Sequence, residues 1–182
     1  MLIGLISDTH IPEAMPEVPA QVEHAFRGVD LILHAGDMHV IGVLDWLERI
    51  APVLSVRGNG DYPTSYNVHR PGVPDDPRVL ENPVLRYEGF RLGMTHAFPT
   101  PDEVSWDNLD GLMERFFGQP VDVVITGDSH VECIIEERGL FLVNPGSPTL
   151  PRNLTTQLGT VALLELREAS PPAARIIDLK AL

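Results

Sequence analysis

The sequence has little cysteine, few basic side chains and no long apolar run, and each shortage excludes a class of protein. Cys133 is the only cysteine among 182 residues, so no disulfide can form within the chain, and this usage favours the cytoplasm. Lys and Arg number 13 against 26 Asp and Glu, which gives a formal charge of -13. Strong affinity for nucleic acid is not expected, because it needs clustered cations. No segment approaches the ~20 apolar residues of a membrane span, so no membrane partner is expected either.

The residues that are present suit one globular domain over residues 1–182. Hydrophobic residues make up 43% of the chain, enough for a single core at this length. The apolar run Leu2–Ile6 is short, has no basic flank and leads directly into Ser7 and Asp8. It therefore predicts a first strand rather than a signal peptide.

Strand-like and helix-like segments alternate in the first third of the chain. Residues 2–6, 31–35 and 52–57 are short apolar runs of the kind found in strands buried on both faces. Between them, residues 20–27 and 41–49 place apolar side chains at helical spacing. This order predicts an α/β fold with a parallel sheet.

The rest of the chain predicts more antiparallel pairing. Residues 62–82 contain several prolines and are expected to form a loop. Asp102–Phe117 is expected to be a helix with Asp102 as its cap. Strand 121–126 and three hairpins complete the prediction, the hairpins pairing 84–87 with 91–95, 133–137 with 140–143, and 160–167 with 175–179.

Asp, Asn and His residues recur where the predicted strands end. They are Asp8 and His10, Asp37, Asn59 and Asp61, His96, and Asp128 and His130. In open α/β sheets the carboxyl ends of the strands line the ligand crevice, so these residues are expected at one rim. Carboxylate and amide oxygens with imidazole nitrogens suit a divalent metal such as Mn, Zn or Fe.

Each of these short motifs has an ordinary explanation when it is taken alone. Gly36-Asp37 and Asn59-Gly60 are common turn dipeptides, and a single Asp8-Thr-His10 is more often a turn with an incidental histidine. Five matching strand ends in order are much harder to obtain by accident. The joint pattern therefore predicts a metal-binding cluster.

The ordered motifs resemble those of the calcineurin-like metallophosphoesterases. The residues that carry the resemblance are Asp8-Thr-His10, Gly36-Asp37, Gly58-Asn59-Gly60-Asp61, Thr95-His96, Gly127-x-x-His130 and Asn144-Pro-Gly-Ser147. The resemblance spans residues 3 to about 152 and is nearest to the small single-domain bacterial and archaeal phosphodiesterase branch, which is itself similar to a retromer subunit of eukaryotes. It implies a four-layer α/β/β/α sandwich of two mixed sheets flanked by helices.

The resemblance also implies a ligand set for two divalent ions. The first ion would be held by Asp8, His10, Asp37 and His130. Asp37 would bridge to a second ion held also by Asn59, His96 and Asp128. Asn59 would contact a phosphate oxygen, Asp61 would orient neighbouring groups, and the turn Asn144–Ser147 would shape the wall of the site. Arg152 is a candidate phosphate contact, with a surface cation the equal alternative.

The activity implied is hydrolysis of a small or exposed phosphoester, most simply a phosphodiester, by in-line attack of a metal-bridging hydroxide. Mn is the expected metal. The types of ligand do not distinguish it from Fe, Zn or Ni, so these three metals remain alternatives. The resemblance further implies a homo-oligomer.

The sequence departs from the family pattern at three positions. Asp128 stands where the family has a metal-binding histidine, and Phe98 replaces a second histidine after Thr95-His96. Gly60 stands where larger phosphatases have a histidine that acts as general acid, so the leaving group would have to be intrinsically good or be protonated by water or by another residue. His39 and His69 are candidate donors, with surface histidines the stronger interpretation for both. These changes keep open an alternative function, a metal-binding or protein-interaction module of the same fold with weakened catalysis.

Overall fold

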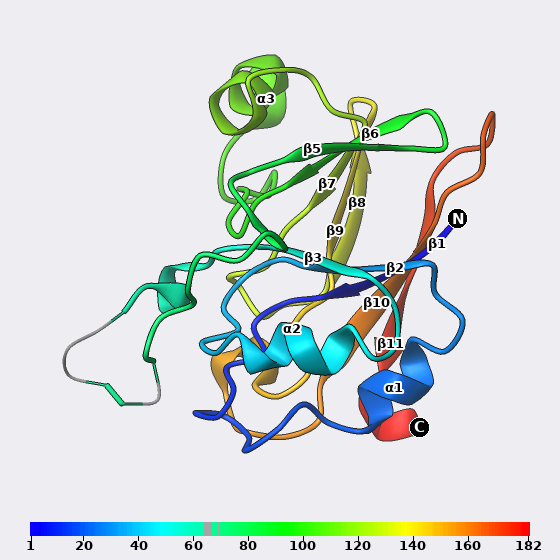
Figure 1. Cartoon of the computed structure of the whole chain (residues 1–182). Helices are drawn as coiled ribbons and strands as arrows, with labels where there is room; N and C mark the ends of the chain where they lie inside the picture. Colours follow the sequence, from blue (N-terminus) through cyan, green and yellow to red (C-terminus); the bar gives the residue numbers. More distant parts are fainter. Residues whose placement is uncertain (64–66, 69) are drawn as a thin grey trace.

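The computed structural model describes residues 1–63, 67, 68 and 70–182, and it shows two mixed β-sheets with helices on their outer sides (Figure 1). The first sheet has six strands in the order β11-β10-β1-β2-β3-β4. These strands are β1 (Leu2–Ile6), β2 (Leu31–His34), β3 (Val53–Val56), β4 (Val79–Leu80), β10 (Thr160–Glu165) and β11 (Ala173–Asp178). Strands β1 to β4 run parallel, and the hairpin β10–β11 joins antiparallel to β1.

The second sheet has five strands in the order β5-β6-β7-β9-β8. They are β5 (Val84–Tyr87), β6 (Phe90–Met94), β7 (Val123–Ile125), β8 (Cys133–Glu137) and β9 (Leu140–Asn144). Strands β6, β7 and β9 are parallel, while β5 and β8 pair antiparallel at the two edges. Each sheet is therefore mixed, with parallel strands at its centre.

Three apolar clusters separate four layers of structure. Helices α1 (Gln21–Ala25) and α2 (Gly42–Leu47) cover the first sheet, and α3 (Leu109–Phe117) covers the second (Figure 1). Between the sheets, Leu5 of β1 shares a cluster with Ile125 of β7. Burial of these apolar faces drives the layers together, so the predicted α/β/β/α sandwich of two mixed sheets is confirmed.

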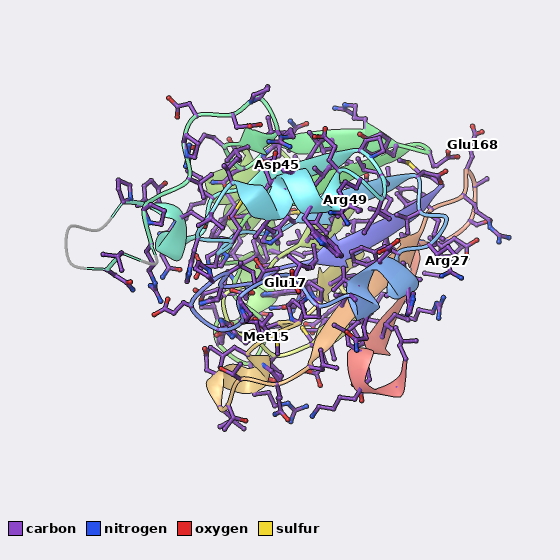
Figure 2. All side chains as sticks on the ribbon, turned by 60° about the horizontal axis from the view of Figure 1, so that its bottom comes forward. Met15, Glu17, Arg27, Asp45, Arg49 and Glu168 are labelled. Atoms are coloured by element: carbon purple, nitrogen blue, oxygen red, sulfur yellow. The ribbon has the colours of Figure 1, made fainter. Side chains whose placement is uncertain are left out.

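Short 3-10 turns complete the described structure. They are η1 (Asn59–Asp61), η2 (Trp106–Asn108), η3 (Pro151–Asn153) and η4 (Leu179–Ala181). Figure 2 shows the molecule with α1 and α2 toward the viewer, and Asp45 of α2 is exposed on that face. Among the described residues, none of the helices has the length and apolar character that crossing a bilayer requires.

Two local predictions were wrong, and each has a physical cause. The helix predicted over 102–117 begins only at Leu109, because the Asn108 side chain accepts the Gly111 N–H at 3.2 Å and caps it there. The segment before it folds into η2 and a turn. The loop predicted over 62–82 contains β4, which adds to the edge of the first sheet beside β3; residues 64–66 of that loop lie outside the described residues.

Candidate metal centre

The carboxyl ends of five strands from both sheets deliver polar side chains to one site. Strands β1, β2 and β3 of the first sheet lead into Asp8 and His10, Asp37, and Asn59. Strands β6 and β7 of the second sheet lead into His96, and into Asp128 and His130. The strand ends of the two sheets lie against each other at this edge, so all seven predicted metal ligands lie in one cluster.

The backbone at the site adopts a conformation that side-chain-bearing residues rarely take. Positive φ angles occur at Asp8 (53°), His10 (47°), Asp37 (57°), His39 (69°), Asp128 (68°) and His130 (56°). Left-handed conformations of this kind are uncommon for residues other than glycine and concentrate at functional sites. The surrounding sheets hold these sharp turns, which aim the side chains inward immediately after each strand.

The first group of candidate ligands consists of Asp8, His10 and His130, all of them buried. Asp8 Oδ1 lies 3.5 Å from His130 Nε2 and 3.9 Å from His10 Nε2. His10 Nε2 also lies 3.5 Å from Asp37 Oδ2. Atoms that each bind one ion at ~2.0–2.2 Å are separated from one another by roughly these distances. Asp8 Oδ1 and His10 Nε2 are buried without a hydrogen-bond partner among the described residues, which a cation would supply.

The second group is built around Asp37 and His96. His96 Nε2 lies 3.5 Å from Asp37 Oδ1, 3.0 Å from Asn59 Oδ1 and 3.5 Å from Asp128 Oδ1. Asp8 Oδ1 is 4.0 Å from the same nitrogen. The carboxylate of Asp37 thus has one oxygen toward each group, which is the geometry that a bridging ligand needs. The Asp128 side chain is 54% exposed, so this end of the cluster opens to solvent.

Hydrogen bonds fix the orientation of two of the histidines. His96 Nδ1 lies 2.8 Å from the Ala35 carbonyl oxygen, and His130 Nδ1 lies 2.7 Å from that of Leu150. A carbonyl accepts only, so in each ring Nδ1 carries the proton and donates it. Nε2 is then left as the lone-pair donor that faces the cluster, the arrangement common to metal-binding histidines.

Burial alone would lower the pKa of His96, but its hydrogen bond with Asp128 and the charges of Asp8 and Asp37 raise that pKa to about 9 in the metal-free site. A metal ion that binds Nε2 would therefore have to displace a proton from it below this pH. We expect the affinity for Mn²⁺ to rise about tenfold per pH unit from neutral pH toward the pKa of His96, and to level off above it. Titration calorimetry in buffers of different ionisation enthalpy measures the released proton. Affinity that is flat over this range would contradict the expectation, and His96→Gln should abolish this proton release.

Asp61 anchors the loops that carry the ligands. Its Oδ2 accepts the N–H groups of Asp37 (2.9 Å) and Gly58 (2.8 Å), and its Oδ1 accepts those of Met38 (2.9 Å) and His39 (2.8 Å). The side chain is fully buried. Burial raises the pKa of Asp61, and the charge of Asp37 adds to this rise while the N–H donors oppose it. Asp61 thus holds the loop after β2 against the turn after β3; its part in orienting metal ligands stays a prediction.

The turn Asn144–Ser147 forms a wall of the site through hydrogen bonds to the ligand loops. Asn144 Nδ2 donates to the Gly127 carbonyl oxygen at 2.8 Å, and Ser147 Oγ donates to that of Asp8 at 2.7 Å. The close approach of these loops also explains two glycines. A Cβ at Gly36 would lie 2.7 Å from His96 Nδ1, and one at Gly127 would lie 2.7 Å from Asp8 Oδ2. A side chain at either place would displace a candidate ligand.

Arg152 lies at the edge of this region. Its guanidinium is exposed and pairs with Glu132 at 2.7 Å, while its backbone N–H donates to the His130 carbonyl oxygen at 2.9 Å. Its role as a phosphate contact stays a prediction, since that role requires the guanidinium to leave Glu132.

Two buried histidines lie beside the cluster: His34, about which the sequence makes no prediction, and His39, which was expected at the surface. His34 lies within the apolar run that forms β2, and it accepts the Gly36 N–H at 3.1 Å. Burial, together with the charges of His96 and His10, lowers the pKa of His34 to about 3. His39 is not a surface residue but fully buried, with its ring centroid 4.4 Å from that of His10. Burial first, and then His10 and Arg70, lower the pKa of His39 to about 4. His69, the other proton donor considered, lies outside the described residues.

The fold and this ligand cluster together define an α/β/β/α sandwich with a candidate metal centre at one edge of its sheets. Residues 1–169 match the calcineurin-like phosphoesterase superfamily domain. A "probable metallophosphoesterase" of Methanothermobacter thermautotrophicus is 40% identical over 154 residues, which cover 84% of this chain and 80% of that protein. The chain belongs to the calcineurin-like phosphoesterase superfamily, whose members bind divalent metals.

Solved structures share the fold at lower sequence identity. Vps29 of Entamoeba histolytica, in a complex with zinc, superposes with a TM-score of 0.70 at 19% identity, over 98% of this chain and 99% of that one. An archaeal phosphodiesterase superposes with a TM-score of 0.66 at 20% identity, over 97% and 99% of the two chains. The same fold thus occurs in a phosphodiesterase and in a protein of the Vps29 type.

Proposed function

We propose that this protein is a two-metal phosphoesterase that hydrolyses a phosphodiester. The observation that carries the proposal is that Asp8 Oδ1 and His10 Nε2, two of the four buried side-chain atoms without a hydrogen-bond partner among the described residues, lie among the converging ligands; the other two are the ring nitrogens of the neighbouring His39. A carboxylate oxygen and an imidazole nitrogen left in this state cost stability unless a cation binds them. The donor set of oxygens and nitrogens therefore fits a divalent metal pair.

Each residue of the cluster has a distinct part in this proposal. Asp8, His10 and His130 would hold the first ion, and Asp37 would serve both ions; His96 and the Asn59 and Asp128 oxygens would complete the second site. The ion pair, when bound, places positive charge at the phosphoryl oxygens and lowers the pKa of a water that attacks phosphorus. It also offsets the surplus of carboxylates that would otherwise repel a phosphate.

In this proposal Asn59 binds substrate as well as metal. Its side chain is exposed, and its Oδ1 lies 3.0 Å from His96 Nε2. Its amide N–H₂ group can then donate to a non-bridging oxygen of the phosphate. Mn²⁺ is the metal proposed, with Fe, Zn and Ni compatible with the same oxygen and nitrogen ligands; the zinc complex of the Vps29 relative is consistent with this range.

Among the described residues, His39 is the histidine that lies beside Gly60, and it is a poor proton donor for the leaving group. A Cβ at Gly60 would lie 2.7 Å from His39 Nε2, so the His39 ring occupies the space beside the position where larger phosphatases have their acid. Because the pKa of His39 is lowered to about 4, this ring is neutral at physiological pH. The proposal therefore favours esters whose alcohol leaves without strong protonation.

The proposal is tested by assaying the full chain on bis(p-nitrophenyl) phosphate after removal of metals and reconstitution with Mn²⁺. We expect Mn-dependent turnover, and a loss of about 10–100-fold in kcat/KM for Asn59→Ala, in line with losses seen when a group supporting a metal site is removed. Asn82→Ala, in the turn between β4 and β5, is the matched control and should retain activity. No turnover with Mn²⁺, Fe²⁺, Zn²⁺ or Ni²⁺ in a folded, metal-loaded protein would reject the enzyme.

A protein-interaction module is the second candidate, and the likeness to Vps29 favours it. Phe98 supports it, because its ring is packed in an apolar cluster where family members place a second histidine. This candidate predicts metal binding without turnover. Mn-dependent hydrolysis that Asn59→Ala reduces while the thermal unfolding curve stays unchanged would reject it.

A further inference from the structure

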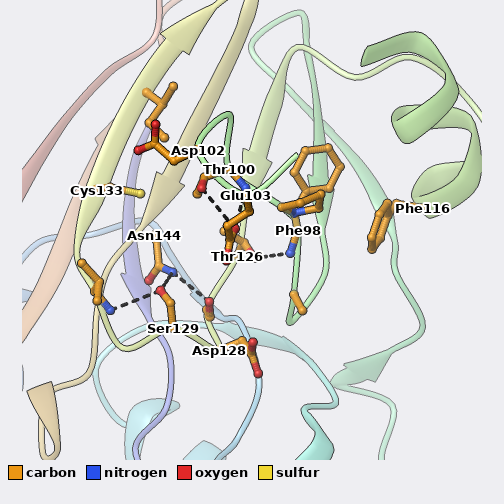
Figure 3. Close-up of a pocket in the computed structure, with 15 residues that line it drawn as sticks. Phe98, Thr100, Asp102, Glu103, Phe116, Thr126, Asp128, Ser129, Cys133 and Asn144 are labelled. Atoms are coloured by element: carbon orange, nitrogen blue, oxygen red, sulfur yellow. Dashed lines mark hydrogen bonds between the residues drawn. The ribbon is translucent and has the colours of Figure 1, made fainter. Parts of the chain in front are cut away.

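A cavity of about 510 Å³ opens directly beside the candidate metal centre. The segment 97–100, which follows His96, and the segment 126–129, which contains Asp128, form its near side (Figure 3). Phe116 of α3 lines the cavity beside Phe98, and strand β8 lines the opposite side (Figure 3). Its volume falls in the range of about 300–1,000 Å³ that ligand pockets have. Because Asp128 Oδ1 is also 3.5 Å from His96 Nε2, the cavity and the second group of ligands share a wall.

The walls of the cavity are mainly apolar. Phe98 and Phe116 stand on one side, with ring centroids 5.0 Å apart, and Cys133 and Ile135 stand on the other. Phe98 is only 5% exposed and also packs on Trp106. An apolar wall of this size beside a polar metal centre gains free energy when an apolar group covers it.

Hydrogen bonds tie the cavity wall to a metal ligand. Thr126 Oγ1 donates to the His96 carbonyl oxygen at 3.0 Å and accepts the Phe98 N–H at 3.0 Å. Thr126 therefore fixes the position of Phe98 relative to His96. A group seated against Phe98 is held at a fixed place relative to the ligands, as a substrate subsite requires.

Every charged residue that lines the cavity is acidic. Asp102, Glu103 and Asp128 contribute carboxylates, and no Lys or Arg occurs among the described residues of the lining. Glu103 is held in place because Thr100 donates to its Oε2 from both N–H (2.8 Å) and Oγ1 (3.1 Å). This charge repels a second phosphate or a carboxylate on the substrate and tolerates a neutral or cationic group.

We propose that the cavity binds one organic group of the phosphoester substrate, an aromatic ring system that carries no negative charge. This inference rests on the proposed function, since the metal centre must hold the phosphate while the ring enters the cavity. The expected substrates are aryl or heteroaryl phosphoesters without a further anionic group. Esters that carry a second phosphate near the first are not expected to bind.

The test measures binding of four ligands to the Mn-loaded full chain by titration calorimetry: inorganic phosphate, methyl phosphate, phenyl phosphate and 4-carboxyphenyl phosphate. We expect phenyl phosphate to bind about tenfold or more tightly than methyl phosphate, because the ring buries apolar area that the methyl group lacks. The carboxyl group should cancel most of this gain. Equal affinity for phenyl and methyl phosphate, or for the phenyl and carboxyphenyl esters, would overturn the inference.

Variants separate the cavity from the metal centre. Phe116→Ala should bring the ratio of phenyl to methyl affinity close to one, whereas Phe90→Ala, in the β5–β6 hairpin outside the cavity, should leave it unchanged. Asp102→Asn with Glu103→Gln should raise the affinity for 4-carboxyphenyl phosphate relative to phenyl phosphate. Failure of these shifts with inorganic phosphate still bound would overturn the cavity alone. Absence of phosphate binding itself would overturn the proposed function and the inference together.

Discussion

Replacing Asp37 with Asn is expected to lower kcat/KM for a phosphodiester by about 10³-fold or more. The change keeps the size of the side chain and an oxygen that can accept the Gly60 N–H, now 2.6 Å from Asp37 Oδ1. It removes the charge and the second ligand oxygen, which lies 3.5 Å from His10 Nε2. A bound metal contributes several kcal/mol to the transition state, and about 4 kcal/mol corresponds to this loss.

The measurement is the steady-state rate of hydrolysis of bis(p-nitrophenyl) phosphate with Mn²⁺, alongside metal analysis of each protein. Asp75→Asn is the matched control, because Asp75 makes an exposed pair with Arg57 and lies outside the ligand cluster. Its activity should be unchanged. If Asp37→Asn retained its activity and its metal content, the bridging role of Asp37 would be wrong.

Replacing Asp61 with Ala is expected to destabilise the protein by at least about 3 kcal/mol. Four buried N–H groups lose a charged acceptor, and each unsatisfied buried donor costs roughly 1–3 kcal/mol before the structure relaxes. The loss concerns the backbone of Asp37 and its neighbours, so the ligand loop should also become mobile. In a chain of this size we expect the melting temperature to fall by about 6–12 °C.

Differential scanning calorimetry of the metal-free protein measures this effect without a contribution from bound ions. Asp61→Asn is the matched variant, since it keeps oxygen acceptance on one side and should lose less stability than Asp61→Ala. Equal melting temperatures for Asp61→Ala and the unchanged protein would show that the four hydrogen bonds do not hold the loop.

Much of the fold could be predicted because its strands are short apolar runs bounded by turns. Leu2–Ile6 is buried along nearly its whole length, so its pattern leaves little choice other than a central strand. The start of α3 could not be predicted, because Asp102 and Asn108 are both good caps by residue type and only the capping geometry at Asn108 decides between them.

The position of the site could be predicted from the residues at the strand ends, whereas the surroundings of the site could not. The order of parallel strands in the first sheet brings Asp8 and Asp37 together, and this order can be inferred from the sequence, whereas the approach of His96 depends on the packing of the second sheet against the first. The burial of His39 and the cavity beside Phe98 depend on packing between segments distant in sequence, such as α3 against β8. One signal was available for His39, since an unusually small Gly60 leaves space that a neighbouring side chain can occupy.

Anomalous diffraction from crystals grown with Mn²⁺ tests whether the centre is dinuclear and bridged by Asp37. A bridged pair of ions predicts two anomalous peaks per chain, about 3.5–4 Å apart. One peak should lie among Asp8, His10 and His130, and the other should lie among Asn59, His96 and Asp128. A single peak, or two peaks that do not share the Asp37 carboxylate, would contradict it.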